Sequence, residues 1–595
     1  MTIITKHITF FSKSQHVHFQ SSMPERRMLL ASRAQPPKLL QVPKSSTKNS
    51  TFKEFLLHSP LPSPALPSIL PRHGKKPPAL NTRRTLRYLT WLFILTGTFY
   101  LISWFRGTEQ KVVEQVYQHA NGHSYEIVED SQLPDFASPL AVTDAEGESR
   151  WTIHIPANRG FPLPAKEYQD ICSHIDEVAK HVAVTKGDEE EGRNLQYYDP
   201  EPNYIDVAQA QLSELIPFDP SFKPGGQVPV CKSSMIYVLD AADAGLGGSL
   251  LGLWLSYGLA QREKRAFFID DSHFAYGKYS SLFEKPAPPS CRPPPPTHRV
   301  PCPRMSQHLV VSSATWQWTF GEAFHEKFTD KQVFDMMRVG YETLFKLLPH
   351  DQVYVDSRIS QLRRQVGEAN LLAGMHIRRG DRHPDEFQYQ QGYIPPAEYA
   401  AALQKLVEST TTTYLSATSS SKQNSTFMLA TDDADMYHDP ELNGLAIRAQ
   451  ERISLTSNKQ LSEGGLGWEK GFFKDSFWNL GLPENMRKQK HLNSPLPSKD
   501  SKYEHKLLGT GSGEVFDPSR DYRTEPTAEA IQLRNYIGRA YLLDLAVLAQ
   551  SDRLVCAVSS RGCRILGVMM GWDQVDKGHW KNIDAGDSLG WRAQL

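Results

Sequence analysis

The middle of the chain alternates between strand and helix patterns, and this alternation constrains the fold more than any other feature. Met235–Leu239 and Ala266–Ile269 are short apolar runs typical of buried strands, and Ser249–Gln261 between them repeats apolar residues at helical spacing. Two strands joined by a helix pair in parallel, because a tight hairpin cannot connect parallel strands. The sequence therefore predicts an α/β fold with a parallel sheet that begins near residue 226.

An uncharged run before this region, residues 88–105, predicts a membrane span. Arg87 and Arg106 bracket the run. As a helix it would be about 27 Å long, which matches the hydrocarbon core of a bilayer. Aromatic residues stand at both of its ends, where they suit the two membrane interfaces. We expect one transmembrane signal-anchor helix here; a buried core helix is the competing interpretation.

Charge divides the chain at this span. Residues 1–87 are rich in proline and hold 15 Lys and Arg against 2 Asp and Glu, which predicts a disordered basic tail in the cytosol. A mitochondrial transit peptide is the competing interpretation. The whole chain has 66 Lys and Arg and 66 Asp and Glu, so the residues after the tail carry a net negative charge. The zero net charge of the whole chain argues against a nucleic-acid-binding protein. We expect residues 106–595 in the Golgi lumen, as a single-pass type II protein with a stem at 106–225.

Two stretches interrupt the α/β pattern. Residues 409–426 are rich in Ser and Thr, and residues 456–520 are rich in Gly, Pro and Lys. Both are expected to be surface insertions. Asn424, inside the first, begins a glycosylation sequon that is accessible in a luminal protein.

A glycine-rich turn follows the first strand of the α/β region. Gly245, Gly247 and Gly248 stand where the first crossover helix begins. Glycines let backbone N–H groups at a helix N-terminus approach an anion closely. Tight packing of a short connection explains the same residues equally well.

A basic cluster follows a later strand. The apolar run Leu371–Ile377 predicts that strand, with His376 near its end and Arg378 and Arg379 directly after it. In an open α/β sheet the carboxyl ends of the strands form the ligand-binding edge. Two guanidinium groups at this edge can hold a pyrophosphate and stabilise the charge on a departing phosphate. A solvated basic turn paired with Asp381 is the alternative.

A third motif lies further toward the C-terminus. The strand Leu554–Val558 runs into Ser559 and Ser560, which can cap the next helix and place its N-terminus beside an anion. Cys556 and Cys563 are close enough in sequence for a disulfide in an oxidising lumen. Two buried free thiols are the alternative.

These motifs together resemble the α1,6-fucosyltransferase family, glycosyltransferase family 23, with wider kinship to protein O-fucosyltransferases. The family shows a His-x-Arg-Arg-x-Asp-Lys motif, an Ala-Thr-Asp-Asp segment and a Val-Cys-x-x-Ser-Ser-x-x-Cys-Arg segment. The corresponding segments here are His376–Arg382, Ala430–Asp433 and Val555–Arg564, in the same order. The resemblance covers roughly residues 230–572, and Arg382 replaces the lysine of the first motif.

The resemblance implies a GT-B-like enzyme with two α/β lobes, residues 226–371 and a Rossmann-like donor lobe at 372–595. It implies a hexosyltransferase that moves L-fucose from GDP-fucose to a glycan with inversion. It points to the GlcNAc of N-glycans, in α1,6 linkage, as the acceptor. No metal or other cofactor is expected. The expected partners are GDP-fucose, a glycan or glycoprotein acceptor and the membrane, with no nucleic acid.

The resemblance also implies a role for each matching residue. Glu386, ten residues after the motif histidine, would be the catalytic base, beside Arg382. Arg378 and Arg379 would support the departure of GDP. The expected donor-binding residues are Gly245, Gly247, Gly248, His376, Arg378, Arg379, Asp381, Tyr399, Asp432, Asp433, Asp544, Ser559 and Ser560. The expected disulfides are Cys556–Cys563 and Cys231–Cys291.

Other functions stay open at this point. The acceptor could instead be a Ser or Thr of a protein, or a polysaccharide. Because Arg382 departs from the family motif, a catalytically inactive luminal sugar-binding protein is a further alternative. Asp433 and Asp435 could form a metal-binding Asp-x-Asp pair, as in manganese-dependent glycosyltransferases. Without the motif upstream, Glu386 would be one more exposed acid.

Overall fold

The computed structural model describes most of the chain between residues 133 and 591. The described residues are 133–144, 146–186, 195–218, 228–240, 245–367, 370–380, 393–414, 427–442, 444, 446–457, 459, 468–469, 472–473, 480–481, 522, 525–584 and 591. All of them belong to one compact unit, residues 109–595. The predicted tail, the predicted membrane helix at 88–105 and the first part of the predicted stem lie outside the described residues. No helix in the described part of the chain has both the length and the apolar character that a bilayer crossing requires.

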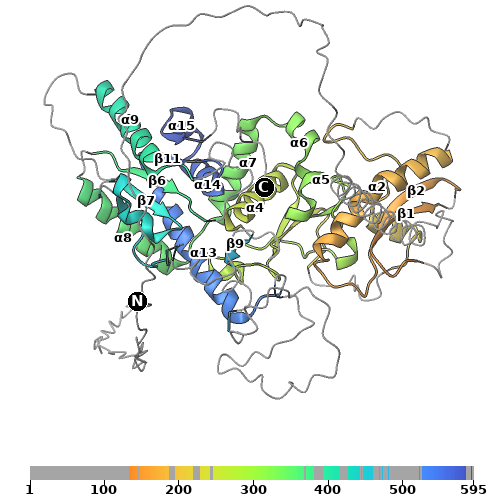
Figure 1. The fold of residues 1–595 in the computed structure, drawn as a ribbon. Coiled ribbons are helices and arrows are strands. Elements are labelled where there is room, and N and C mark those ends of the chain that lie inside the picture. Colours follow the sequence, from red (N-terminus) through yellow and green to blue (C-terminus); the bar gives the residue numbers. More distant parts are fainter. Residues whose placement is uncertain are drawn as a thin grey trace, which may run out of the picture. The chain divides into compact units, whose positions relative to one another are not determined.

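The first sheet has three parallel strands. β3 (Ser234–Val238) lies between β4 (Ala266–Asp270) and β5 (His308–Val311). The helix α4 (Leu246–Arg262), labelled in Figure 1, is the crossover from β3 to β4. The predicted strand–helix–strand unit and its parallel pairing are therefore confirmed.

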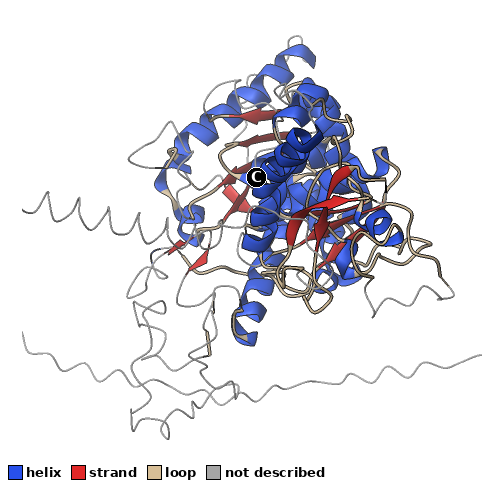
Figure 2. Ribbon diagram, turned by 90° about the vertical axis from the view of Figure 1, so that its right-hand side faces the viewer, coloured by secondary structure: helices blue, strands red, loops and turns tan. Residues whose placement is uncertain are grey.

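The second sheet has five strands in the order β12-β11-β6-β7-β8, and every neighbouring pair is parallel. Its strands are β6 (Ala373–Ile377), β7 (Phe427–Thr431), β8 (Ala446–Arg448), β11 (Arg553–Cys556) and β12 (Trp580–Asn582). The helix α9 (Pro396–Tyr414) packs on one face and α13 (Ala528–Leu548) on the other. Figure 2 shows helices packed around the strands. Because both faces are covered, β6, β7 and β11 are buried along their whole length.

The remaining helices connect the strands and cover the sheets. They are α5 (Trp316–Phe320), α6 (Glu322–Lys327), α7 (Asp330–Leu344), α8 (Pro349–Val366), α14 (Arg561–Met570) and α15 (Trp572–Asp576). Short 3-10 helices are η2 (Tyr279–Ser281), η3 (Pro296–His298), η4 (Ser313–Thr315), η5 (Ala434–His438) and η6 (Pro440–Leu442). Local signals explain the helix starts: a capping box of Thr329 and Gln332 begins α7, and Pro349 begins α8.

The part of the predicted stem that the structure describes is folded, whereas we expected little regular structure there. It contains the antiparallel hairpin of β1 (Ser138–Thr143) and β2 (Ser149–His154), then α2 (Ala165–Lys186) and α3 (Val207–Leu212). The buried side of α2 includes Tyr168, Ile171, Ile175, Val178 and Val182, which follow helical spacing. The polar residues between them made this spacing easy to miss.

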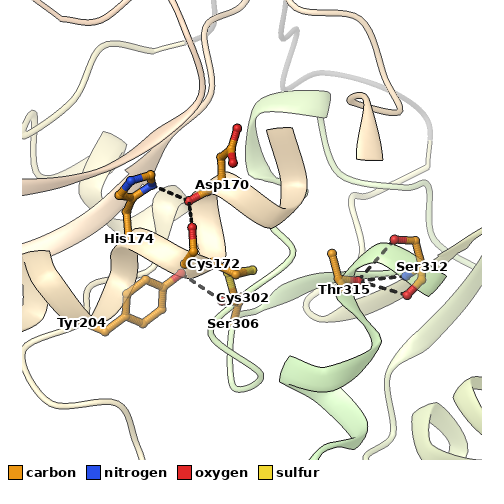
Figure 3. Close-up of a disulfide and its surroundings, with 9 residues drawn as sticks. Asp170, Cys172, His174, Tyr204, Cys302, Ser306, Ser312 and Thr315 are labelled. Atoms are coloured by element: carbon orange, nitrogen blue, oxygen red, sulfur yellow. Dashed lines mark hydrogen bonds between the residues drawn. A yellow bond between two sulfur atoms is a disulfide. The ribbon is translucent and has the colours of Figure 1, made fainter. Parts of the chain in front are cut away.

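This part of the chain is folded because it covers the second face of the three-stranded sheet. Met235 and Tyr237 of β3 pack with α4 and α7, while Val238 packs on the other face with the cluster formed by α2. A parallel sheet needs cover on both faces. The disulfide Cys172–Cys302, whose pairing the sequence left open, fastens α2 to the segment before β5 (Figure 3).

The two sheets share one hydrophobic cluster. It includes Leu250 and Trp254 of α4, Phe334 of α7, Leu543 of α13 and Leu566 of α14. The predicted lobe boundary at residues 371 and 372 separates the sheets in the sequence, since α8 ends before it and β6 begins after it. In the folded unit, however, the helices of both sheets pack on each other.

The predicted insertions are described only in part. The stretch 409–426 was expected to be a surface insertion, and its first residues belong to α9, which continues to Tyr414. Within 456–520, β9 (Trp468–Glu469) and β10 (Phe472–Phe473) form a small antiparallel pair. Most other residues of both stretches, including Asn424, lie outside the described residues.

Candidate functional site

The segments after the strands of the five-stranded sheet meet at one edge. In the sheet register, His376 of β6 pairs with Cys556 of β11 and with Ala430 of β7. The residues that follow these three strands are therefore neighbours. The described residues of the segments His376–Arg382, Ala430–Asp433 and Val555–Arg564 therefore come together at the edge where open α/β sheets bind ligands.

The turn after β6 is bonded to the end of β7. The backbone N–H of Arg379 donates to Oδ1 of Asp432 at 2.5 Å. Burial raises the pKa of Asp432, while the charge of Arg378 and the backbone N–H groups of Arg379 and Gly380 act in the opposite direction. The carboxylate of Asp432 is thus engaged by this turn and lies within electrostatic reach of Arg378.

The two motif arginines differ in placement, although the sequence predicts the same role for both. Arg379 is only 8% exposed, and its guanidinium donates to the carbonyl of Ile394 at 2.8 Å and to that of Arg378 at 3.3 Å. The same guanidinium lies over the ring of Tyr393, 5.0 Å from its centroid. Arg378 is half-buried, and its charge acts on both His376 and Asp432. The structure therefore turns the Arg379 side chain into the protein, whereas the charge of Arg378 acts on His376 and Asp432.

His376 is 6% exposed. Burial, and after it the charge of Arg378, lower the pKa of His376 to about 4, so the ring is neutral near pH 7. Among the described residues its Nδ1 has no hydrogen-bond partner. A neutral imidazole donates from one nitrogen and accepts at the other, so this side chain is suited to a polar, uncharged ligand group.

The ring of His376 lies at a tight junction between α4 and α14. A Cβ placed on Gly562, in the first turn of α14, would be 2.9 Å from Cε1 and Nε2 of His376 and 2.9 Å from Oη of Tyr541. A Cβ on Gly247 of α4 would be 3.1 Å from the same Tyr541 hydroxyl. Tyr541 of α13 was not predicted, because only the packing of these helices brings it to the motif residues.

The three predicted glycines of α4 are not equivalent. A Cβ on Gly247 would be 2.8 Å from the Cβ of Arg561, so this glycine is required by close helix packing. Among the described residues, nothing lies within 4 Å of a Cβ placed on Gly245 or Gly248. Of the two interpretations open from the sequence, tight packing therefore applies to Gly247, and the described residues do not crowd the other two.

The turn before α14 is held by polar residues after β12. The backbone N–H of Val558 donates to Oδ1 of Asn582 at 3.1 Å, and that of Ser559 donates to Oδ2 of Asp584 at 2.9 Å. Ser560 occupies the N-cap position of α14, as expected, but its side chain makes no capping hydrogen bond. Asn582 and Asp584 were missed because short polar residues after a strand carry no distinctive sequence signal.

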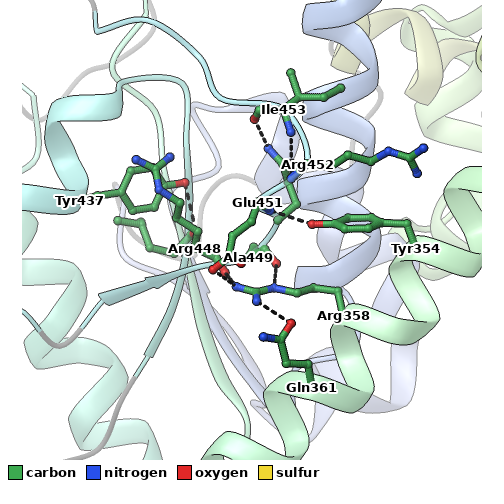
Figure 4. Close-up of polar contacts among 11 residues, drawn as sticks. Tyr354, Arg358, Gln361, Tyr437, Arg448, Ala449, Glu451, Arg452 and Ile453 are labelled. Carbon is green, nitrogen blue, oxygen red and sulfur yellow. Dashed lines mark hydrogen bonds and ion pairs between the residues drawn. The ribbon is translucent and has the colours of Figure 1, made fainter. Parts of the chain in front are cut away.

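Asp544 lies in α13, on the side that faces the end of β8. It is 5% exposed, and burial raises its pKa well above the ordinary value, while hydrogen bonds from Gln450 and the charge of Arg448 oppose the shift. The segment that contains Gln450 is held by Arg358 of α8, which donates to the carbonyls of Arg448 at 2.6 Å and Ala449 at 3.1 Å (Figure 4). Asp544 thus belongs to the same sheet edge as the motif residues.

Two further predicted donor-binding residues lie in other surroundings. Tyr399 is 2% exposed and packs in the hydrophobic cluster between α9 and the sheet. Asp433 caps η5, where its carboxylate accepts from the N–H of Asp435 at 3.2 Å.

Asp381, Arg382 and Glu386 lie outside the described residues, so their predicted roles stay predictions. The predicted disulfides Cys231–Cys291 and Cys556–Cys563 are both present. Cys556–Cys563 joins the last residue of β11 to the first turn of α14, directly beside Ser559 and Ser560.

No protein-family model matches the sequence, and no curated protein matches it either. Solved structures with some likeness to the chain include NodZ α-1,6-fucosyltransferase soaked with GDP-fucose, with a TM-score of 0.25 and 14% identity over 60% of this chain and 100% of that chain. They also include fucosyltransferase NodZ from Bradyrhizobium, with a TM-score of 0.25 and 13% identity over 56% of this chain and 92% of that chain. Likenesses with TM-scores this low determine neither the fold nor the activity of the chain.

Proposed function

We propose that this protein is an inverting fucosyltransferase that transfers L-fucose from GDP-fucose to a glycan. The observation that supports this most is the turn after β6, where Arg378 stands with neutral His376 and Asp432 at the carboxyl edge of a parallel sheet. A guanidinium at such an edge suits a nucleotide diphosphate. The order of the three motifs, which resembles that of α1,6-fucosyltransferases, narrows the donor to GDP-fucose.

In this proposal each part of the edge has a separate task. Arg378 stabilises the negative charge that develops on GDP as the bond to the sugar breaks. The N-terminus of α14 adds a favourable dipole beside Ser559 and Ser560, whose own backbone N–H groups donate to Asp584 and to the carbonyl of Ala557. His376 and Asp544 are assigned to the nucleoside, which presents uncharged polar groups that a neutral imidazole and a carboxyl can hydrogen-bond.

The acceptor hydroxyl needs a base to take its proton as it attacks the anomeric carbon. We assign this task to Glu386 on its position in the sequence alone, with Arg382 beside it. We further propose a GT-B-like arrangement of the two lobes, and an N-glycan GlcNAc in α1,6 linkage as the acceptor. No metal takes part in the proposed mechanism, and residues 88–105 anchor the enzyme in the Golgi membrane as a type II protein.

The test is GDP release from GDP-fucose by the purified protein, with glycopeptide, peptide and free-glycan acceptors offered in parallel. Replacing Arg378→Ala should lower kcat/KM about 100-fold or more, because the leaving group loses its cation. Arg364→Ala is the matched control, since Arg364 is an exposed arginine of α8. It should leave the rate unchanged.

Each outcome of this assay has a definite meaning. Undiminished turnover in Arg378→Ala would remove this residue from the site. Donor binding without transfer to any acceptor would favour the sugar-binding alternative. Turnover that persists in a chelator supports a metal-free reaction, whereas its loss, restored by Mn²⁺, would contradict that part of the proposal.

A further inference from the structure

The turn Arg378–Gly380 is held from two opposite sides, and only one of these was visible in the sequence motifs. On the first side, Asp432 accepts the N–H of Arg379 at 2.5 Å. A Cβ on Gly380 would lie 2.8 Å from Oδ2 of Asp432 and 3.8 Å from a terminal nitrogen of Arg378. The carboxylate therefore fits closely against the backbone of the turn, and Arg378 is next to this contact.

On the second side, Tyr393 makes two contacts with the same turn. Its hydroxyl donates to the carbonyl oxygen of Gly380. Its ring lies under the guanidinium of Arg379, 5.0 Å from the ring centroid. That guanidinium also donates to the carbonyl of Ile394, the residue after the tyrosine, at 2.8 Å. Residues 393 and 394 are thus tied to residues 379 and 380 by a hydrogen bond in each direction and a cation–π contact.

We propose that Tyr393 is a positioning residue for Arg378. The N–H of Arg379 is held by Asp432 and the carbonyl of Gly380 by Tyr393, so the peptide units that follow Arg378 are fixed from both ends. The backbone from which Arg378 projects is then already ordered when a ligand arrives, and such preorganisation of an electrostatic site lowers the cost of binding. This inference rests on the proposed function, since it takes a nucleoside diphosphate as the ligand of Arg378.

A positioning role predicts a selective loss of ligand binding. A disturbed Arg378 weakens contact with the diphosphate but not with the nucleoside. A purely structural role for Tyr393 would instead weaken the binding of every ligand together, or lower only the stability of the fold. Comparing GDP with guanosine separates these two roles.

The variant Tyr393→Phe removes only the hydroxyl and keeps the ring beneath Arg379. The matched control is Tyr536→Phe, because Tyr536 is a 50% exposed tyrosine of α13. In the full-length protein, GDP affinity is measured by titration calorimetry and guanosine affinity by displacement of bound GDP. Tyr393→Phe should weaken GDP binding about three- to ten-fold, the effect of losing one neutral hydrogen bond, and leave guanosine binding unchanged. Because the hydroxyl donates to Gly380 in the free protein too, a small fall in the unfolding temperature accompanies this change.

A second variant, Tyr393→Leu, also removes the cation–π contact and should weaken GDP binding more than Tyr393→Phe does. Equal GDP affinity in wild type and Tyr393→Phe would overturn the inference. So would equal losses for GDP and guanosine. If the wild-type protein binds no GDP, the proposed function itself fails and this inference fails with it, an outcome that the wild-type titration identifies before any variant is made.

Discussion

Gly247 and Gly248 are neighbours in the sequence, but the junction between α4 and α14 uses only the first. A Cβ on Gly247 would be 2.8 Å from the Cβ of Arg561, whereas one on Gly248 would meet no atom within 4 Å in the part of the chain that the structure describes. Gly247→Ala should therefore lower the free energy of unfolding by about 1–3 kcal/mol, the usual cost of overpacking. Gly248→Ala, the matched control, should be neutral or stabilising, since alanine favours a helix more than glycine does.

Chemical denaturation of the two variants checks this prediction. If Gly247→Ala and Gly248→Ala had equal free energies of unfolding, the two helices would be able to separate at Gly247 without cost. Loss of GDP affinity in Gly248→Ala at unchanged stability would place the ligand against the open side of α4. The pair thus separates the two interpretations of the glycine-rich turn that the sequence alone left open.

How far single residues could be predicted depends on where their partners lie in the chain. His376 lies at the end of β6, Arg378 follows that strand and Asp432 follows the adjacent β7, so the motifs at strand ends were enough to expect them at one edge. Tyr541 could not be found in this way, because its neighbours Gly247 and Gly562 come from different lobes and meet only through helix packing. The different placements of the two motif arginines were equally hidden, since a sequence does not show which way a guanidinium turns.

At the scale of elements, α2 is the clearest departure from the sequence analysis. The helix was overlooked because its buried residues are separated by Lys, Asp, Glu and His, and because nothing local shows that the three-stranded sheet lacks a cover on one face. The strands themselves were predictable from short apolar runs between turns. Cysteine pairs that are distant in the sequence, such as Cys172 and Cys302, could not be predicted, because their pairing depends on the tertiary fold.

Because α2 covers one face of the three-stranded sheet, the disulfide Cys172–Cys302 that fastens it should contribute measurably to the free energy of unfolding. Cys172–Cys302 closes a loop with a sequence separation of 130, and Cys556–Cys563 one with a separation of 7. Because a cross-link restricts the unfolded chain more when its loop is longer, the first should contribute about 5 kcal/mol and the second about 2 kcal/mol. The double replacement Cys172→Ser with Cys302→Ser should therefore be the more destabilising.

Denaturant unfolding of the two double variants under non-oxidising conditions provides the comparison. Mass spectrometry confirms that the remaining cysteines stay paired. A larger loss from Cys556→Ser with Cys563→Ser would mean that local geometry at α14 outweighs loop length. It would also identify the short disulfide as the main support of the turn at Ser559 and Ser560.

At the scale of the whole described unit, the two sheets are joined by more than a flexible hinge. Their helices contribute to one hydrophobic cluster. Arg338 of α7, a helix of the first lobe, donates to the carbonyls of Val568 at 2.8 Å and Met569 at 2.5 Å in the last turn of α14. A cation at the C-terminus of a helix is favourable for the helix dipole as well as for these carbonyls. Trp591 adds a further link, since its ring packs on Phe334 of α7 and on Gly567 of α14.

This shared core predicts that both lobes unfold together. A calorimetric scan should show one transition for the described unit, because separating the lobes would expose the cluster to water on both sides. If GDP binds only the folded protein, it should raise the temperature of the whole transition. At a GDP concentration of 100 times its dissociation constant, the free energy of unfolding should increase by about 2.7 kcal/mol. Tryptophan fluorescence and far-UV circular dichroism should give the same midpoint. Two transitions, of which GDP moves only one, would show instead that the lobe containing Arg378 is stable alone and that the contacts of Arg338 and Trp591 contribute little to the coupling.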